Sequence, residues 1–226
     1  MSAEPSATTQ PVDLLPIDIT TYTGNTAIQY VMTFDSEKPG PHLLVNALTQ
    51  GNEVCGAHAL DYLFRNEVTP VRGKLSLCFA SIDAYETFDV ANPAASRCLD
   101  EDYNRLWAAE VLEAPTRSRE HERAKLLRPL FDEIDHMLDL HSMQTPSPAL
   151  ALAGTTEKCL ETSMAIRVPA HIVVDAGLKV IAQAGTKIAR DGTRPVVTAY
   201  DDCVLIMPTR RIKRGQTAVR FGRYRP

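Results

Sequence analysis

The first 177 residues alternate apolar runs with amphipathic stretches, and this pattern constrains the fold more than any other feature. Residues 42–48 (HLLVNAL) are typical of a buried strand, and residues 54–65 have the periodicity of a helix. Residues 74–79 alternate apolar and polar side chains, as a strand does. Two more short strands are predicted at 137–140 and 170–174. Strands joined through helices predict an α/β fold, with a mixed, largely parallel sheet flanked by helices.

A longer helix is predicted from Ser118 to about Leu138, because apolar residues recur there in steps of three and four. Ser118 is a suitable N-cap, and Pro129 predicts a kink or a later helix start. His121 falls on this helix, and we expect it at the surface.

The net charge of −4 conceals a division of the chain into two parts. Residues 178–226 hold 11 basic and 3 acidic residues, a net charge of +8, which leaves −12 for residues 1–177. The basic part has short runs separated by glycine-containing turns, with strands expected at 178–181, 195–200 and 203–207. We therefore predict two domains, an α/β domain over 1–177 and a small basic β domain over 178–226.

Composition excludes several classes of protein. No apolar run approaches the roughly 18 residues that a membrane-spanning helix needs. The five cysteines include no CxxC pair, so neither a disulfide framework nor a cysteine-rich zinc site is indicated. The N-terminal residues lack the pattern of a signal peptide, and we expect a cytoplasmic protein. The basic run 210–214 is interpreted as a solvated face, so no nucleic-acid or membrane partner is expected, and a homo-oligomer is left open.

Three polar segments fall where strands or loops are predicted to end. They are Gln50–Glu53, Arg97–Arg105 and Asp139–Ser142. Ligand sites of such sheets lie beyond the carboxyl ends of the strands, so we expect the three segments to meet at one edge.

These segments contain the residue types of an open metal site with an anion-binding rim. Glu53 and His141 are ligand types that zinc takes in hydrolytic sites. Arg97, Asn104 and Arg105 suit a substrate carboxylate or a developing oxyanion. The alternatives are that Glu53 is a carboxylate at a helix N-terminus and His141 a hydrogen-bonded loop residue, and that Arg105 pairs with Asp100 or Asp102.

The sequence resembles a known family through three motifs in the same order. These are the runs NALTQGNEVCG (46–56), SRCLDEDYNR (96–105) and DLHS (139–142). They are similar to those of the succinylglutamate desuccinylase/aspartoacylase family, a branch of the zinc carboxypeptidase-like hydrolases. The resemblance covers roughly residues 40–177, and the basic tail resembles the family's C-terminal β domain.

The resemblance implies hydrolysis of an amide bond in an N-acyl amino acid or a related small carboxylate, with one zinc ion as cofactor. It implies zinc ligands at Gln50, Glu53 and His141. Arg97 would polarise the scissile carbonyl, and Asn104 with Arg105 would hold the substrate carboxylate.

Two departures from the family pattern bear on activity. Gln50 stands where the family has a histidine ligand, and zinc prefers imidazole to an amide oxygen. The glutamate that takes a proton from the zinc-bound water is not found, as though a segment were missing between Gly177 and Leu178; Asp175 is the nearest carboxylate. Two functions follow: a zinc-dependent deacylase, or a catalytically impaired relative that binds a small carboxylate or a partner subunit without turnover.

Overall fold

The computed structural model describes residues 12, 14–142, 151, 178–191, 193–206 and 220–222. The chain divides into two compact units, Met1–Ser142 and Met143–Pro226. The domain boundary predicted between residues 177 and 178 lies outside the described residues, as does the strand predicted at 170–174, and both stay predictions.

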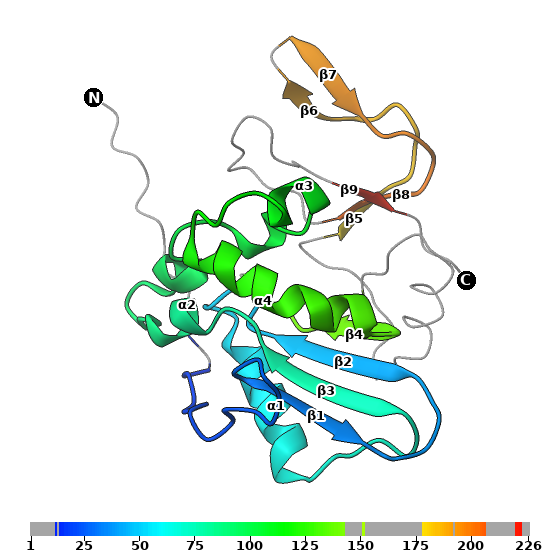
Figure 1. The fold of residues 1–226 in the computed structure, drawn as a ribbon. Helices are drawn as coiled ribbons and strands as arrows, with labels where there is room; N and C mark the ends of the chain where they lie inside the picture. Colours follow the sequence, from blue (N-terminus) through cyan, green and yellow to red (C-terminus); the bar gives the residue numbers. More distant parts are fainter. Residues whose placement is uncertain are drawn as a thin grey trace. The chain divides into compact units, whose positions relative to one another are not determined.

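The first unit is built on a mixed four-stranded sheet in the order β1-β3-β2-β4 (Figure 1). Its strands are β1 (Val31–Asp35), β2 (His42–Ala47), β3 (Lys74–Phe79) and β4 (His136–Asp139). β2 pairs in parallel with both β3 and β4, and β1 runs antiparallel to β3 at one side. The predicted α/β class is confirmed, with the antiparallel strand β1 as an addition that the sequence pattern had not indicated.

Helices and short 3₁₀ turns connect these strands (Figure 1). They are α1 (Val54–Arg65), α2 (Ile82–Glu86), η1 (Pro93–Arg97), η2 (Tyr103–Arg105), α3 (Ala109–Leu112) and α4 (Arg119–Glu133). The predicted helix 54–65 and strand 74–79 have the bounds that the sequence indicated. Both predictions succeed because a clear apolar period coincides with a chain segment that is buried on one side.

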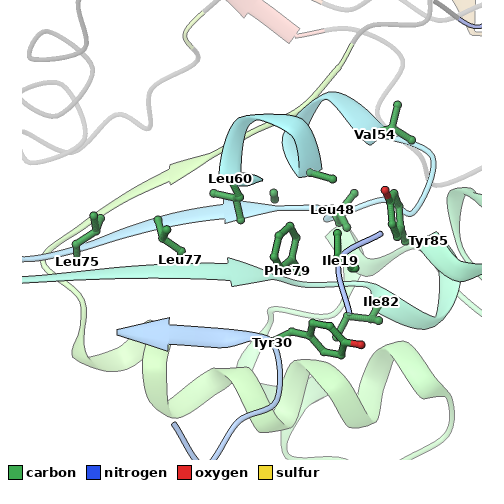
Figure 2. Packing of buried hydrophobic residues seen from close by; sticks show 12 residues of the cluster. Ile19, Tyr30, Leu48, Val54, Leu60, Leu75, Leu77, Phe79, Ile82 and Tyr85 are labelled. Carbon is green, nitrogen blue, oxygen red and sulfur yellow. The ribbon is translucent and has the colours of Figure 1, made fainter. Parts of the chain in front are cut away.

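Side chains of β3 alternate between two apolar layers. Leu77 and Phe79 point to the layer that contains α1, where they pack with Leu60 (Figure 2). Cys78 belongs to the opposite layer, where it packs with residues of α4 such as Leu127. The sheet is therefore covered on both faces, as parallel pairing requires.

Helix α4 starts as predicted but ends earlier. The Ser118 hydroxyl accepts from the backbone N–H of His121 at 2.9 Å and so caps the helix. Pro129 lies within the helix, which continues to Glu133. The predicted extension to residue 138 is wrong, because the chain turns extended at Ile134 and enters β4, whose pairing with β2 prevails over the helical period.

His121 was expected at the surface, and this is wrong as well. Its side chain is fully buried in the first turn of α4. It lies one turn before the buried Ala124, so it belongs to the inward face of the helix.

An N-terminal segment ties α1 and α2 to the core. Ile19 is buried in the α1 layer, and the Tyr85 hydroxyl accepts from the N–H of Ile17 and donates to its carbonyl oxygen, at 2.7 and 2.9 Å. Tyr22 stacks on Phe64 with 4.3 Å between ring centroids. Through these contacts the N-terminal segment packs against α1 and α2, the two helices that flank the loop after β2.

The second unit contains short antiparallel pairings. Its described strands are β5 (Leu178–Ile181), β6 (Lys187–Asp191), β7 (Arg194–Val197), β8 (Cys203–Ile206) and β9 (Arg220–Gly222). They form a three-stranded sheet, β5-β8-β9, and a β6-β7 hairpin. The strands predicted for the small β module are present as β5, β7 and β8, whereas β6 and β9 were not predicted.

None of the helices among the described residues is both long and apolar enough to cross a membrane. The cytoplasmic location expected from the sequence stays a prediction.

Leu60→Ala should lower the free energy of urea unfolding by about 2–5 kcal/mol, because the buried side chain leaves a cavity between α1 and the sheet. Leu126→Ala, on the exposed side of α4, is the matched control and should change stability by about 0.5 kcal/mol or less. Equal losses in the two variants would contradict the described layering.

Candidate functional site

The first and third motifs meet because their strands are parallel neighbours. Gln50–Glu53 follows β2, and His141 follows β4. Asn46 and Asp139 are paired residues at the ends of these strands, so the two loops leave the sheet at the same edge. The predicted meeting of these segments is confirmed.

Gly51 lets the loop after β2 pack against the chain behind it. A Cβ at this position would lie 2.4 Å from the carbonyl carbon of Ala84 and 2.5 Å from the carbonyl oxygen of Ser96. These are backbone atoms that cannot turn aside, so only glycine fits. The N–H of Gly51 also donates to the carbonyl oxygen of Arg97 at 3.2 Å, which brings the second motif to the same edge.

Gln50 is the centre of the cluster, and only 1% of its surface is exposed. With its amide nitrogen pointing inward, Gln50 donates to the carboxylate of Glu53, whose two oxygens are each 3.1 Å away, and the nitrogen lies 3.1 Å from His141 Nδ1. The oxygen then accepts from the side-chain amide of Asn104. One side chain thus contacts residues from all three motifs.

His141 lies between two carboxylates. Its Nδ1 is 2.7 Å from Oε2 of Glu53, and its Nε2 is 2.7 Å from Oδ2 of Asp139. The hydrogen bond with Asp139, followed by the one with Glu53, raises the pKa of His141 to about 10, although burial acts against this. Glu53 stands at the N-cap position of α1 and makes no capping hydrogen bond, so its carboxylate serves the cluster and not the helix end.

The second motif places two arginines beside the cluster. Arg97 is half-buried and pairs with Asp102, with 3.3 Å between the guanidinium and the carboxylate. Arg105 is exposed and donates to the carbonyl oxygen of Asn104 at 3.3 Å. Asp102 therefore pairs with Arg97, and no ion pair of Arg105 with Asp100 or Asp102 is found among the described residues.

A buried carboxylate holds the loop that follows Arg97. Glu120, only 4% exposed, accepts from the backbone N–H of Leu99 at 2.6 Å and from that of Asp100 at 3.2 Å. Asp100 in turn accepts from the N–H of Arg119 at 3.0 Å. The first turn of α4 thereby fixes the path of the second motif.

The zinc ion that the family pattern implies requires a certain spacing of its donor atoms. Two ligands of a tetrahedral zinc, each about 2.1 Å from the metal, lie about 3.4 Å apart. Glu53 and His141 are in direct hydrogen-bond contact at 2.7 Å, which is closer than two ligands of one zinc ion lie. Among the described residues no group of three or more His, Cys, Asp or Glu side chains is arranged to hold a metal. The cluster as it stands does not fit zinc.

Some residues of the site carried no individual sequence signal. Asp102 was weighed only as a partner for Arg105, and Asp139 was noted only as part of its motif. Glu120 has nothing in the sequence that sets it apart from the charged residues around it. Asn46 is a polar residue inside an apolar strand segment, and this was the sequence signal that indicated a buried hydrogen-bond network.

The fold is that of an α/β protein of the zinc carboxypeptidase-like class. Residues 39–192 match the succinylglutamate desuccinylase/aspartoacylase catalytic domain. The chain belongs to this family, whose members are amide hydrolases and typically zinc-dependent.

The solved structures of two Vibrio enzymes agree with this fold. The succinylglutamate desuccinylase of Vibrio cholerae is 14% identical with a TM-score of 0.53, and the match covers 85% of each chain. That of Vibrio parahaemolyticus is 13% identical with a TM-score of 0.52, covering 84% of this chain and 85% of the other. The match to the Chromobacterium violaceum desuccinylase is 20% identical with a TM-score of 0.40; it covers half of this chain and only 36% of that enzyme. No curated protein matches the sequence.

Glu120→Ala should lower the free energy of unfolding by about 1–3 kcal/mol, because two backbone N–H groups lose a buried charged acceptor. Amide hydrogen exchange at Leu99 and Asp100 should become faster in this variant. Glu122→Ala removes an exposed carboxylate from the same helical turn and is the control. If both variants left exchange at residues 99 and 100 unchanged, the anchoring role of Glu120 would be refuted.

Proposed function

We propose that this chain binds a small carboxylate of the N-acyl amino acid class at the three-motif cluster, and that amide hydrolysis there is slow or absent. The observation that carries the proposal is the position of Gln50. It is buried and, with its nitrogen inward, it donates to Glu53, accepts from Asn104 and lies 3.1 Å from His141 Nδ1, so it contacts residues of all three motifs. The residues of a deacylase site are thus held together by the side-chain amide of Gln50, at the position where the family has a zinc ligand.

The arginines support the choice of a carboxylate ligand. The guanidinium of Arg105 is exposed, and no described carboxylate pairs with it. Arg97 is held by a single 3.3 Å contact with Asp102, which a ligand anion is able to replace. A planar guanidinium binds a carboxylate through two parallel hydrogen bonds, and Asn104 adds an amide beside it.

Turnover would need an activated water and a base. The position of Arg97 suits a carbonyl oxygen that gains charge during amide cleavage. Glu53, the nearest buried carboxylate, is hydrogen-bonded to His141. Asp175, the other carboxylate considered for the base, lies outside the described residues. The hydrogen bond that engages Glu53 with His141 supports binding without efficient hydrolysis.

A zinc-dependent deacylase is the second candidate, and one observation favours it. Asp139 accepts from Nε2 of His141 and leaves Nδ1 directed at Glu53. A carboxylate behind the ring is the usual partner of a metal-binding histidine. Zinc at Gln50, Glu53 and His141 would require Gln50 to turn its oxygen inward and the Glu53–His141 hydrogen bond to open.

Metal analysis separates the two candidates. The purified chain should contain far less than one equivalent of zinc, whereas a zinc deacylase would hold about one equivalent and lose it in Glu53→Ala and His141→Ala. Gln50→His should raise zinc affinity at least about tenfold, since imidazole replaces an amide, and should restore little turnover. A wild-type chain with one equivalent of zinc and rapid hydrolysis of N-acyl amino acids would overturn the binding proposal.

Ligand binding is tested directly by calorimetry with N-succinylglutamate and an N-acyl aspartate. Arg105→Ala should weaken binding about tenfold or more, because a charge-assisted hydrogen bond is lost. Arg65→Ala, an exposed arginine that pairs with Asp61 on α1, is the matched control and should bind as the wild type does. Binding that is absent, or that is indifferent to Arg105, contradicts the assigned rim.

A further inference from the structure

Behind His141 lies a buried hydrogen-bonded group that none of the preceding roles uses. Asn46, at the end of β2, and Thr49, in the loop before Gln50, are 1% and 3% exposed. The amide nitrogen of Asn46 donates to Oδ1 of Asp139 at 2.8 Å, and the Thr49 hydroxyl donates to the same oxygen at 2.8 Å. The Asn46 amide also donates to the Thr49 hydroxyl at 2.9 Å.

These contacts divide the two oxygens of Asp139 between two tasks. Oδ1 takes both donors from the β2 side, and Oδ2 faces Nε2 of His141 at 2.7 Å. A carboxylate that is held at one oxygen cannot rotate freely at the other. The backbone supports the same arrangement, because the N–H of Leu140 donates to the carbonyl oxygen of Asn46 at 2.9 Å.

We propose that Asn46 and Thr49 are positioning residues that clamp Asp139 and so fix the ring of His141 in the site. The clamp acts through Asp139 and touches no ligand. His141 itself is partly exposed, and Glu53 holds only its Nδ1 side, so the orientation of the ring also depends on Asp139 at Nε2. The inference deepens the proposed function, since it concerns the orientation of one residue of that site.

Placement in the chain explains why the clamp can form. Asn46 and Asp139 are directly paired across parallel strands, so their side chains emerge on the same side of the sheet. Thr49 follows where the chain leaves β2 and turns back over this pair. The two donors therefore come from the segment that also carries Gln50. Their hydrogen bonds to Asp139 connect the loop after β2 with the loop after β4.

The experiment measures the chemical shifts of the ring nitrogens of His141 in long-range ¹H–¹⁵N spectra. The sample is the full chain with ¹⁵N-labelled histidine, with a chelator present and no ligand added. The Nε2 signal is identified by its absence in His141→Gln. In Thr49→Val the Nε2 signal should shift in the direction of a weaker hydrogen bond to Asp139, or should broaden, because Asp139 loses one of the donors that hold it. Thr49→Ser keeps the hydroxyl and should restore the wild-type signal.

Thr33→Val is the matched control, because it removes a hydroxyl that is paired with Ser76 elsewhere on the same sheet. It should leave the His141 signals unchanged. Asn46→Ala is the second variant if Thr49→Val does not fold, and it should shift the same signal. An unchanged His141 Nε2 in a folded clamp variant, or an equal change in Thr33→Val, would overturn the proposal. The readout needs neither ligand nor turnover, so it remains valid if the carboxylate-binding proposal fails.

Discussion

The parallel pairing of β2 with β3 and β4 is the constraint on which the site depends. It sets Asn46 opposite Asp139, and it makes the loops after β2 and β4 leave the sheet at one edge. Residues 88 positions apart in the sequence, Glu53 and His141, come within 2.7 Å for this reason. The apolar layers on both faces hold the pairing, because each strand then buries both of its faces.

The cluster shows how a neutral amide alters a site built for a metal ion. Two carboxylates and an imidazole in a half-buried position require either a cation or a shared proton. Here hydrogen bonds join His141 to Glu53 and Asp139 and raise the pKa of His141 to about 10, and Gln50 adds a donor to Glu53. An imidazole at residue 50 would offer a third good zinc ligand once the Glu53–His141 hydrogen bond opened, so the identity of this side chain bears directly on whether the site holds a metal.

Local patterns were reliable where period and burial agreed, as in α1 and β3. The pattern failed at the end of α4, because Ile134 and Leu138 continued a helical period by coincidence while the backbone there was needed to pair with β2. It also misplaced His121, since a histidine in a charged helical turn looks solvated until the packing of that turn is known. Strand β1 was missed because its antiparallel pairing with β3 is a long-range contact.

The sequence alone determined the α/β class, the β module, the family and the three motifs, because strand and helix periods and motif order are properties of the chain itself. The tertiary structure alone decided what these motifs do to one another. Only in the folded chain does Gln50 contact residues of all three motifs. Only there does Asp102 pair with Arg97 and not with Arg105. The hydrogen bonds of Asn46 and Thr49 with Asp139 likewise form only in the folded chain. Hydrogen bonds between distant side chains depend on strand register and burial, which no local pattern encodes.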